Sequence, residues 1–208
     1  MKISSNELQR YDDNTRMNHW AVALLFIVAG LSGLAFFHPS LFFLSNLFGG
    51  GTWSRILHPY FGVLMFLSFV GIYARLRHDN VLNDTDREWL SKSGELFRGN
   101  KAAMPPMGKY NAGQKLVFWL MTFSLLVLLV TGILFWHAWF PFFPIWARRI
   151  GVLLHAVSAV VLVLTVIVHV YAAIWVKGTT RAMTRGTVTP GWAKMNHPLW
   201  YDEMTRGK

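Results

Sequence analysis

Four histidines of this 208-residue chain lie inside long apolar runs, where imidazoles are uncommon. His155 and His169 stand near the two ends of the run VLLHAVSAVVLVLTVIVHV (152–170), while His19 and His58 lie early in two other apolar runs. An imidazole in an apolar surrounding costs free energy unless it has a partner. Each of these histidines therefore needs either a hydrogen-bond partner or a metal.

The spacing of His155 and His169 predicts that both project from one face of a helix. Fourteen residues separate them, which is a rise of about 21 Å and a rotation roughly 40° short of four full turns. Gly33 follows His19 at the same spacing, and a glycine there would let a bulky group approach the backbone. The pattern favours two ligand sites stacked along a bundle of helices.

Haem b fits this pattern, because it takes one neutral imidazole on each face of its iron and fills the space between helices. We predict two b haems, one held by His58 and His155 and the other by His19 and His169. Two histidines on each iron leave no open coordination position, which suits electron transfer. A single buried histidine is more often structural, but four at matching depths favour ligation.

The other histidines lie at the ends of apolar runs or in polar segments, where a solvated side chain is expected: His38, His78, His137 and His197. His137 would replace His58 as a ligand if the second apolar run entered the membrane later in the sequence than we predict below. Pro59 follows His58 directly, so it is either tolerated in a first helical turn or kinks the helix there.

The elements that must position these histidines are predicted transmembrane helices. The chain is 53% hydrophobic, with 10 Trp and 16 Phe, which is typical of an integral membrane protein. The fold class predicted is all-α, a four-helix membrane bundle forming a single domain over 1–208, with a loop at 76–113 and a tail at 178–208. The spans are predicted at about 18–37, 53–75, 114–137 and 149–177.

The absence of cysteine from the sequence narrows the possible chemistry. It excludes disulfides, iron–sulfur clusters, covalent CxxCH haem attachment and thiolate zinc sites within this chain. Redox chemistry here must use histidine, methionine or a bound organic cofactor. Residues 1–16 are polar and the first apolar run is long, so no cleavable signal peptide is expected.

The distribution of Lys and Arg predicts the orientation in the membrane. Seventeen of these residues fall at the N-terminus, within 75–115 or from Lys177 onward, and three fall on the other side. The positive-inside rule then places both termini in the cytoplasm. This makes His58 and His155 the outer pair and His19 and His169 the inner pair. The net charge of +10 follows from topology, so no nucleic-acid partner is expected.

Several runs share the pattern of one known family: RMNHW (16–20), RILHPYFGV (55–63), YNAGQK (110–115), HVYAAIWVKGT (169–179) and WAKMNHPLWY (192–201). Together they resemble the cytochrome b (gamma) subunit of membrane-bound respiratory formate dehydrogenases. This di-haem family is shared with the cytochrome b subunits of nickel–iron hydrogenases. The resemblance covers essentially the whole chain, and the long loop with YNAGQK favours the formate dehydrogenase branch.

The resemblance implies a role within a larger complex of the bacterial inner membrane, which is expected to form a higher oligomer. The partners would be a molybdopterin catalytic (alpha) subunit, carrying Mo or W, and an iron–sulfur (beta) subunit. Electrons from formate would pass from the clusters to the outer haem, then the inner haem, then a menaquinone or ubiquinone. The four ligands would match His19, His58, His155 and His169, and the formate site would lie in another chain.

The resemblance also implies a quinone site beside His169, formed by Asn111, Gly113 and Gln114. Ala112 stands where an aromatic residue is often found in the family. Two amides and a glycine can serve the carbonyls of a quinone. Taken without the family, the same residues are better explained as a helix N-terminus with Asn111 as its N-cap.

Arg55, Arg148 and Arg149 are the three basic residues predicted on the outer side. Any of them could pair with a haem propionate, although interfacial snorkelling is the plainer interpretation. Two alternatives for the whole chain stay open. One is a cytochrome b subunit serving a nickel–iron hydrogenase or another periplasmic oxidoreductase. The other is a haem-free membrane anchor or small transporter, which the lack of Asp, Glu and Lys in the span interiors disfavours.

Overall fold

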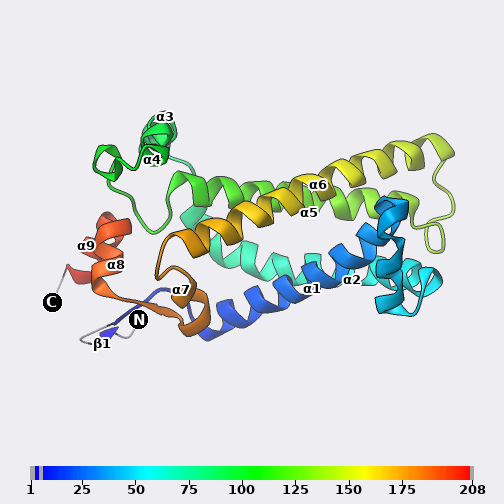
Figure 1. Ribbon diagram of the computed structural model, residues 1–208, viewed down its shortest axis with the longest axis horizontal. Coiled ribbons are helices and arrows are strands. Elements are labelled where there is room, and N and C mark those ends of the chain that lie inside the picture. The colour runs from blue at the N-terminus through cyan, green and yellow to red at the C-terminus, as the bar shows by residue number, and fades with distance from the viewer. Residues whose placement is uncertain (1–2, 5–6, 207–208) are drawn as a thin grey trace. The chain divides into compact units, whose positions relative to one another are not determined.

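The predicted spans are all helices in the computed structural model, which describes residues 3–4 and 7–206 (Figure 1). Over that part of the chain, the helices long and apolar enough to cross a membrane are α1 (Asp13–Phe37), α2 (Gly51–Leu76), α5 (Ala112–Phe135) and α6 (Ile145–Trp175). The prediction of a helical membrane protein with four spans is therefore confirmed.

The four long helices begin a few residues before their predicted spans. α1 begins at Asp13, before the apolar run, because the side chain of Asp12 accepts a hydrogen bond from the backbone N–H of Thr15 at 2.7 Å. α6 begins at Ile145, directly after Pro144. Pro59 lies well inside α2, and the helix continues through it. Hydropathy locates the apolar stretch but not the residue at which the helix begins.

Shorter elements fill the regions between and beyond the spans. The 3-10 helices are η1 (Pro39–Phe48), η2 (His78–Asn80) and η3 (Lys101–Ala103), and the further α-helices are α3 (Asp84–Ser91), α4 (Ser93–Phe97), α7 (Thr180–Arg185), α8 (Pro190–Asn196) and α9 (Pro198–Thr205). The strands β1 (Ile3–Ser4), β2 (Glu7–Gln9) and β3 (Thr187–Val188) form an antiparallel sheet in that order. The all-α class is confirmed, and this small sheet was not anticipated because strands so short show no detectable alternation.

Over its described residues the chain divides into two compact units. The first, here called the bundle unit, comprises Met17–Ala74 and Leu120–Val166. The second, the loop-and-tail unit, comprises Met1–Arg16, Arg75–Trp119 and Ile167–Lys208. Each unit has its own packing.

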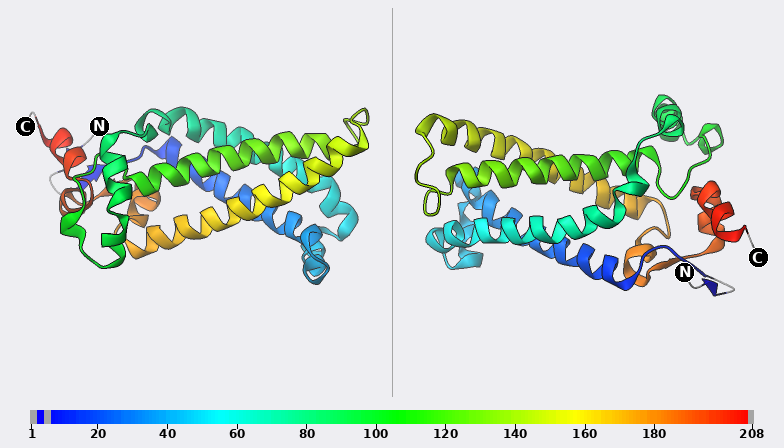
Figure 2. Two further views of the ribbon diagram at one scale, coloured as in Figure 1. Left: turned by 90° about the horizontal axis from the view of Figure 1, so that it is seen from above. Right: turned by 180° about the vertical axis from the view of Figure 1, so that it is seen from behind.

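Those parts of α1, α2, α5 and α6 that belong to the bundle unit lie side by side, as both views of Figure 2 show. The Asn18 side chain of α1 donates to the carbonyl oxygen of Ser68 on α2 at 2.8 Å. α5 and α6 pack closely at Gly151, where an added Cβ would lie 3.3 Å from the Cβ of Leu134. Large apolar side chains such as Leu24, Leu67 and Leu153 face outward, as a lipid-facing surface requires.

The loop-and-tail unit has a small core of its own: Leu8, Ala182, Val188, Trp192, Ala193 and Trp200. This core joins the N-terminal strand to the C-terminal helices through the pairing of Leu8 with Val188. The segment 178–208, expected only as a tail, is therefore folded over its described residues.

His197 corrects one prediction, because it is buried in this unit and is 2% exposed. Its Nδ1 donates to the carbonyl oxygen of Gly108 at 2.8 Å, and its Nε2 faces the Arg10 guanidinium at 3.4 Å. Position relative to the apolar runs predicted a solvated side chain. The prediction fails because the burial arises from packing between distant segments. His38, His78 and His137 are exposed, as expected.

The burial of His197 predicts a pH-dependent stability of the loop-and-tail unit. Burial, and then the nearby Arg10 charge, lower the pKa of His197 to about 3 from its ordinary 6.5. Between these values the unfolded chain binds the extra proton, so stability falls as pH falls below 6.5. At pH 5 the loss is about 2 kcal/mol. Thermal unfolding followed by tryptophan fluorescence at pH 7.5 and pH 5 measures it.

His197→Asn is the test variant, because its amide can replace Nδ1 as donor to Gly108 without titrating. We expect this variant to lose the pH dependence between 7.5 and 5. His78→Asn, at an exposed histidine of the same unit, is the control and should keep it. An unchanged pH dependence in His197→Asn would contradict the assignment of this pH dependence to His197.

Candidate functional site

His58 of α2 and His155 of α6 converge inside the bundle unit. Their ring centroids are 6.2 Å apart, with the ring planes at 71°. Both side chains are half-buried. The structure therefore brings together the two residues that the sequence assigned to the outer pair, whereas the competitor His137 is exposed beyond the end of α5.

Neighbouring helices hold both rings through Nδ1. His58 Nδ1 lies 3.1 Å from the carbonyl oxygen of Ala29 and 3.0 Å from Ser32 Oγ, both on α1. His155 Nδ1 lies 3.0 Å from Thr131 Oγ1 on α5. These oxygens are acceptors for an Nδ1–H, so the lone pair of each neutral ring falls on Nε2. That tautomer is the one that binds a metal through Nε2.

The hydroxyl groups that hold the rings are fixed in turn. Ser32 Oγ donates to the carbonyl oxygen of Ala29 at 3.0 Å, and Thr131 Oγ1 donates to that of Val127 at 2.6 Å. Each hydroxyl proton is thus used within its own helix, which leaves an oxygen lone pair for the imidazole. The sequence analysis missed both residues. The only signal was a small hydroxyl residue within an apolar run, which is common in membrane helices.

Glycines lie against both histidine rings. A Cβ at Gly33 would lie 2.9 Å from His58 Cε1, closer than packing allows, and one at Gly132 would lie 3.5 Å from His155 Cε1. Any side chain at Gly33 would displace the ring. Two neutral imidazoles from facing helices, anchored at Nδ1 and lined by glycine, fit the axial ligation of a b haem.

The close contact at Gly33 predicts a large effect of substitution. Gly33→Leu should displace His58 and reduce the occupancy of the haem that we assign to His58 and His155 to about half or less of normal. The matched control is Gly30→Leu on the same helix, where an added Cβ meets nothing within 4 Å. Haem-to-protein ratios of the purified variants measure the effect. Equal ratios in the two variants would contradict the role given to Gly33.

The members of the inner pair belong to different units. His19 lies in the bundle unit, half-buried, with its ring edge-to-face against Trp20 at 5.4 Å between centroids. His169 lies on the last part of α6 in the loop-and-tail unit, also half-buried. The pairing of His19 with His169 stays a prediction from sequence.

The proposed quinone residues form the N-terminus of α5. Asn111 Oδ1 accepts from the backbone N–H of Gln114 at 2.9 Å, and Gln114 Oε1 accepts from that of Asn111 at 3.0 Å. This reciprocal pair is a capping box, as expected for Asn111 at a helix start. A Cβ at Gly113 would lie 3.2 Å from Trp89 Cη2, so this glycine permits close packing. Ala112 is fully buried.

The outer arginines differ in their surroundings. Arg148 donates through Nη2 to the carbonyl oxygen of Pro141 at 2.5 Å, which fastens the hairpin before α6. Arg55 and Arg149 are exposed. Their role toward haem propionates stays a prediction.

Comparison with known proteins yields one family and a consistent set of relatives. Residues 10–186 match the family described as prokaryotic cytochrome b561. The chain is 42% identical over 198 residues to the cytochrome b556(fdo) subunit of formate dehydrogenase from Escherichia coli K12, covering 95% of this chain and 93% of the relative. It is 39% identical over 194 residues to the cytochrome b556(Fdn) subunit of the nitrate-inducible enzyme from the same strain, covering 93% and 89%. A Haemophilus influenzae formate dehydrogenase cytochrome b556 subunit is 38% identical over 200 residues, covering 96% and 84%.

Proposed function

The chain belongs to the prokaryotic cytochrome b561 family, and we propose that it is the membrane-anchor and electron-transfer subunit of a formate dehydrogenase. In this proposal it holds two b haems and delivers electrons to a quinone near the cytoplasmic face. The relatives support the formate dehydrogenase assignment, because all of them carry that name and their sequences align with this chain over most of both lengths. Formate oxidation itself belongs to another subunit.

The observation that carries the proposal is the arrangement of His58 and His155. Their ring centroids lie 6.2 Å apart with the ring planes at 71°, and their Nδ1 atoms are held by Ala29, Ser32 and Thr131. These contacts fix the ring orientation and the tautomer, and they keep Nε2 available as the ligand atom. A b haem with two histidine ligands supplies one-electron transfer without an open coordination position.

The proposed inner site uses His19 and His169, with the quinone beside His169 at Asn111, Gly113 and Gln114. The asymmetry of basic residues supports placing the termini and this site at the cytoplasmic side of the inner membrane. Electron movement inward, with protons taken from the cytoplasm, would charge the membrane. Each elementary charge moved costs about 2.3 kcal/mol per 100 mV, which formate oxidation has to supply.

The partners in this proposal are an iron–sulfur (beta) subunit and a molybdopterin catalytic (alpha) subunit. A hydrogenase or another periplasmic oxidoreductase as the electron donor is the alternative with the same chemistry. A haem-free anchor or small transporter is the alternative of another class. The anchored histidine pair argues against the second, because a passive anchor gains nothing from two imidazoles fixed at Nδ1 within a membrane.

Purification of the tagged chain from its native membrane tests the proposal. Formate, added without quinone, should reduce the b haem of the purified complex, and the visible spectrum follows that reduction. Added quinone should then reoxidise it. Hydrogen is the control donor: reduction of the haem by hydrogen and not by formate would favour the hydrogenase alternative. A folded complex without haem would refute the proposal.

A further inference from the structure

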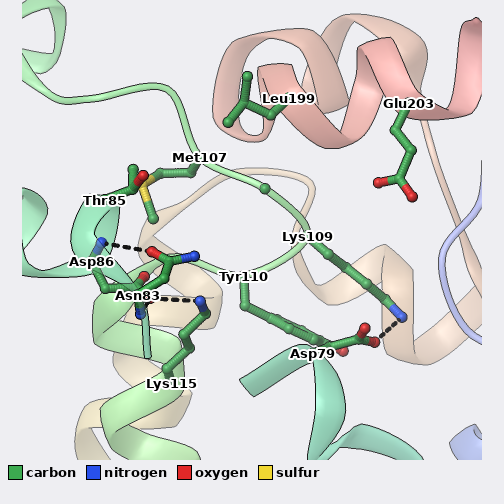
Figure 3. Close-up of a pocket in the computed structure, with 11 residues that line it drawn as sticks. Asp79, Asn83, Thr85, Asp86, Met107, Lys109, Tyr110, Lys115, Leu199 and Glu203 are labelled. Carbon is green, nitrogen blue, oxygen red and sulfur yellow. Dashed lines mark hydrogen bonds and ion pairs between the residues drawn. The ribbon is translucent and has the colours of Figure 1, made fainter. Parts of the chain in front are cut away.

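A polar pocket of about 250 Å³ lies within the loop-and-tail unit (Figure 3). Ionisable side chains from several elements line it: Asp79 of η2, Asp86 of α3, Lys109 and Tyr110 of the segment before α5, Lys115 of α5, and Glu203 of α9. Glu203 is exposed, whereas Asp86 and Lys115 are buried. The pocket therefore connects solvent-exposed carboxylates with a buried ion pair, and it has room for several water molecules.

The buried ion pair is Lys115 with Asp86. Nζ of Lys115 lies 2.6 Å from Asp86 Oδ2, and the two side chains are 7% and 1% exposed. Nζ also donates to the carbonyl oxygen of Val81 at 2.9 Å, and Oδ2 also accepts from the backbone N–H of Asn83 at 2.9 Å. These contacts fasten the segment before α3 to the first turns of α5.

The Asp86–Lys115 pair has a hydrogen-bond acceptor and a donor that these contacts do not use. Among the described residues Asp86 Oδ1 is buried without a hydrogen-bond partner. An ammonium has three N–H groups, and Val81 and Asp86 take two of them. A proton can therefore be added at Oδ1, or donated from Nζ, without breaking an existing contact. A purely structural ion pair gains nothing from a buried unpaired oxygen.

The pocket adjoins the proposed quinone residues along the chain. Tyr110 immediately precedes Asn111, and Lys115 immediately follows Gln114. The segment 110–115 therefore contains both residues of the pocket lining and the proposed quinone residues. Asn111 and Gln114 are held in their capping box, and carboxamides do not release protons at physiological pH. Quinone reduction there needs proton donors other than these two amides.

We propose that Asp86 and Lys115 form the proton relay for quinone reduction, an inference that rests on the proposed function. Reduction of one quinone to the quinol takes two electrons, supplied by formate through this chain, and two protons. Each proton leaves the Asp86–Lys115 pair toward the quinone oxygen, and water in the pocket returns a proton to the pair. The other ionisable residues that line the pocket, among those described, are Asp79, Lys109, Tyr110 and Glu203.

Lys115→Arg in the complete complex tests the relay. Arginine keeps the positive charge and the donors to Asp86 and Val81, but it does not give up a proton in proteins. We expect formate-to-quinone turnover to fall at least about tenfold, with a larger solvent deuterium isotope effect and partial recovery in imidazole buffer. Haem reduction by formate, measured without quinone, should be unchanged.

The double variant Asp86→Asn with Lys115→Gln removes both charges together, and it serves if the larger guanidinium of Lys115→Arg prevents folding. It should show the same loss. The control is Glu88→Gln with Lys92→Gln, an exposed ion pair at 2.7 Å that involves the same helix and lies outside the pocket lining.

Wild-type quinone turnover in either relay variant would overturn the proposal. Slower turnover with an unchanged isotope effect and no recovery in imidazole would also overturn it. The quinone-free assay separates this failure from a failure of the proposed function.

Discussion

His155→Ala should leave the chain with one b haem in place of two. In the structure the rings of His155 and His58 lie 6.2 Å apart between centroids, and Nδ1 of His155 lies 3.0 Å from Thr131 Oγ1. Alanine removes the nitrogen that we propose as ligand and leaves a void in its place. The second haem should survive, because His169 lies fourteen residues further along α6, about 21 Å away. Pyridine haemochrome analysis of the purified variant gives the number of haems per chain.

His58→Ala should cause the same loss as His155→Ala, since we propose both as ligands of the same iron. His19→Ala and His169→Ala should each remove the other haem. His137→Ala is the control, because that histidine is exposed after the end of α5. A normal haem content in His155→Ala, or a loss in His137→Ala, would contradict the ligand assignment.

Arg10→Ala should destabilise the loop-and-tail unit by about 2–4 kcal/mol. The Arg10 side chain is 4% exposed, and its guanidinium lies 4.9 Å from the ring centroid of Trp200 and 5.1 Å from that of Trp192. It also donates to the carbonyl oxygen of Lys109. One side chain thus joins the N-terminal segment, the loop before α5 and the C-terminal helices, so its loss weakens three contacts at once.

Limited proteolysis of the intact complex measures this destabilisation, because cleavage of a folded tail requires local opening. The tail of Arg10→Ala should be cut many times faster than that of the wild type. Arg87→Ala is the matched control in the same unit, since the Arg87 side chain is 88% exposed. Equal cleavage rates for Arg10→Ala and the wild type would show that the packing of Trp192 and Trp200 does not depend on Arg10.

The membrane helices and the histidine spacing were predictable because both are local patterns. About twenty apolar residues in a row predict a span whatever the rest of the chain does, and fourteen residues along α6 fix the relative direction of His155 and His169. The capping box at Asn111 is local as well, and the structure confirms it as the start of α5. The approach of Gly33 to His58 was foreseen only as space for something bulky.

The loop-and-tail unit was not predictable in the same way. Its core depends on pairing of Leu8 with Val188 and on Arg10 reaching His197, contacts between segments far apart in sequence. No periodic pattern marks strands of two or three residues. A single histidine in a polar segment carries no sign that an arginine from the other end of the chain will cover it. The Asp86–Lys115 pair has the same origin, because each residue alone reads as a surface charge.

The haem content of the complex purified with this chain tests the central claim most directly. Pyridine haemochrome analysis, normalised to the amount of this chain, should give two b haems per chain, with the reduced spectrum of a low-spin cytochrome b. One haem would contradict the stacked pair of sites, and no haem in a folded preparation would contradict the assignment of these histidines as ligands altogether.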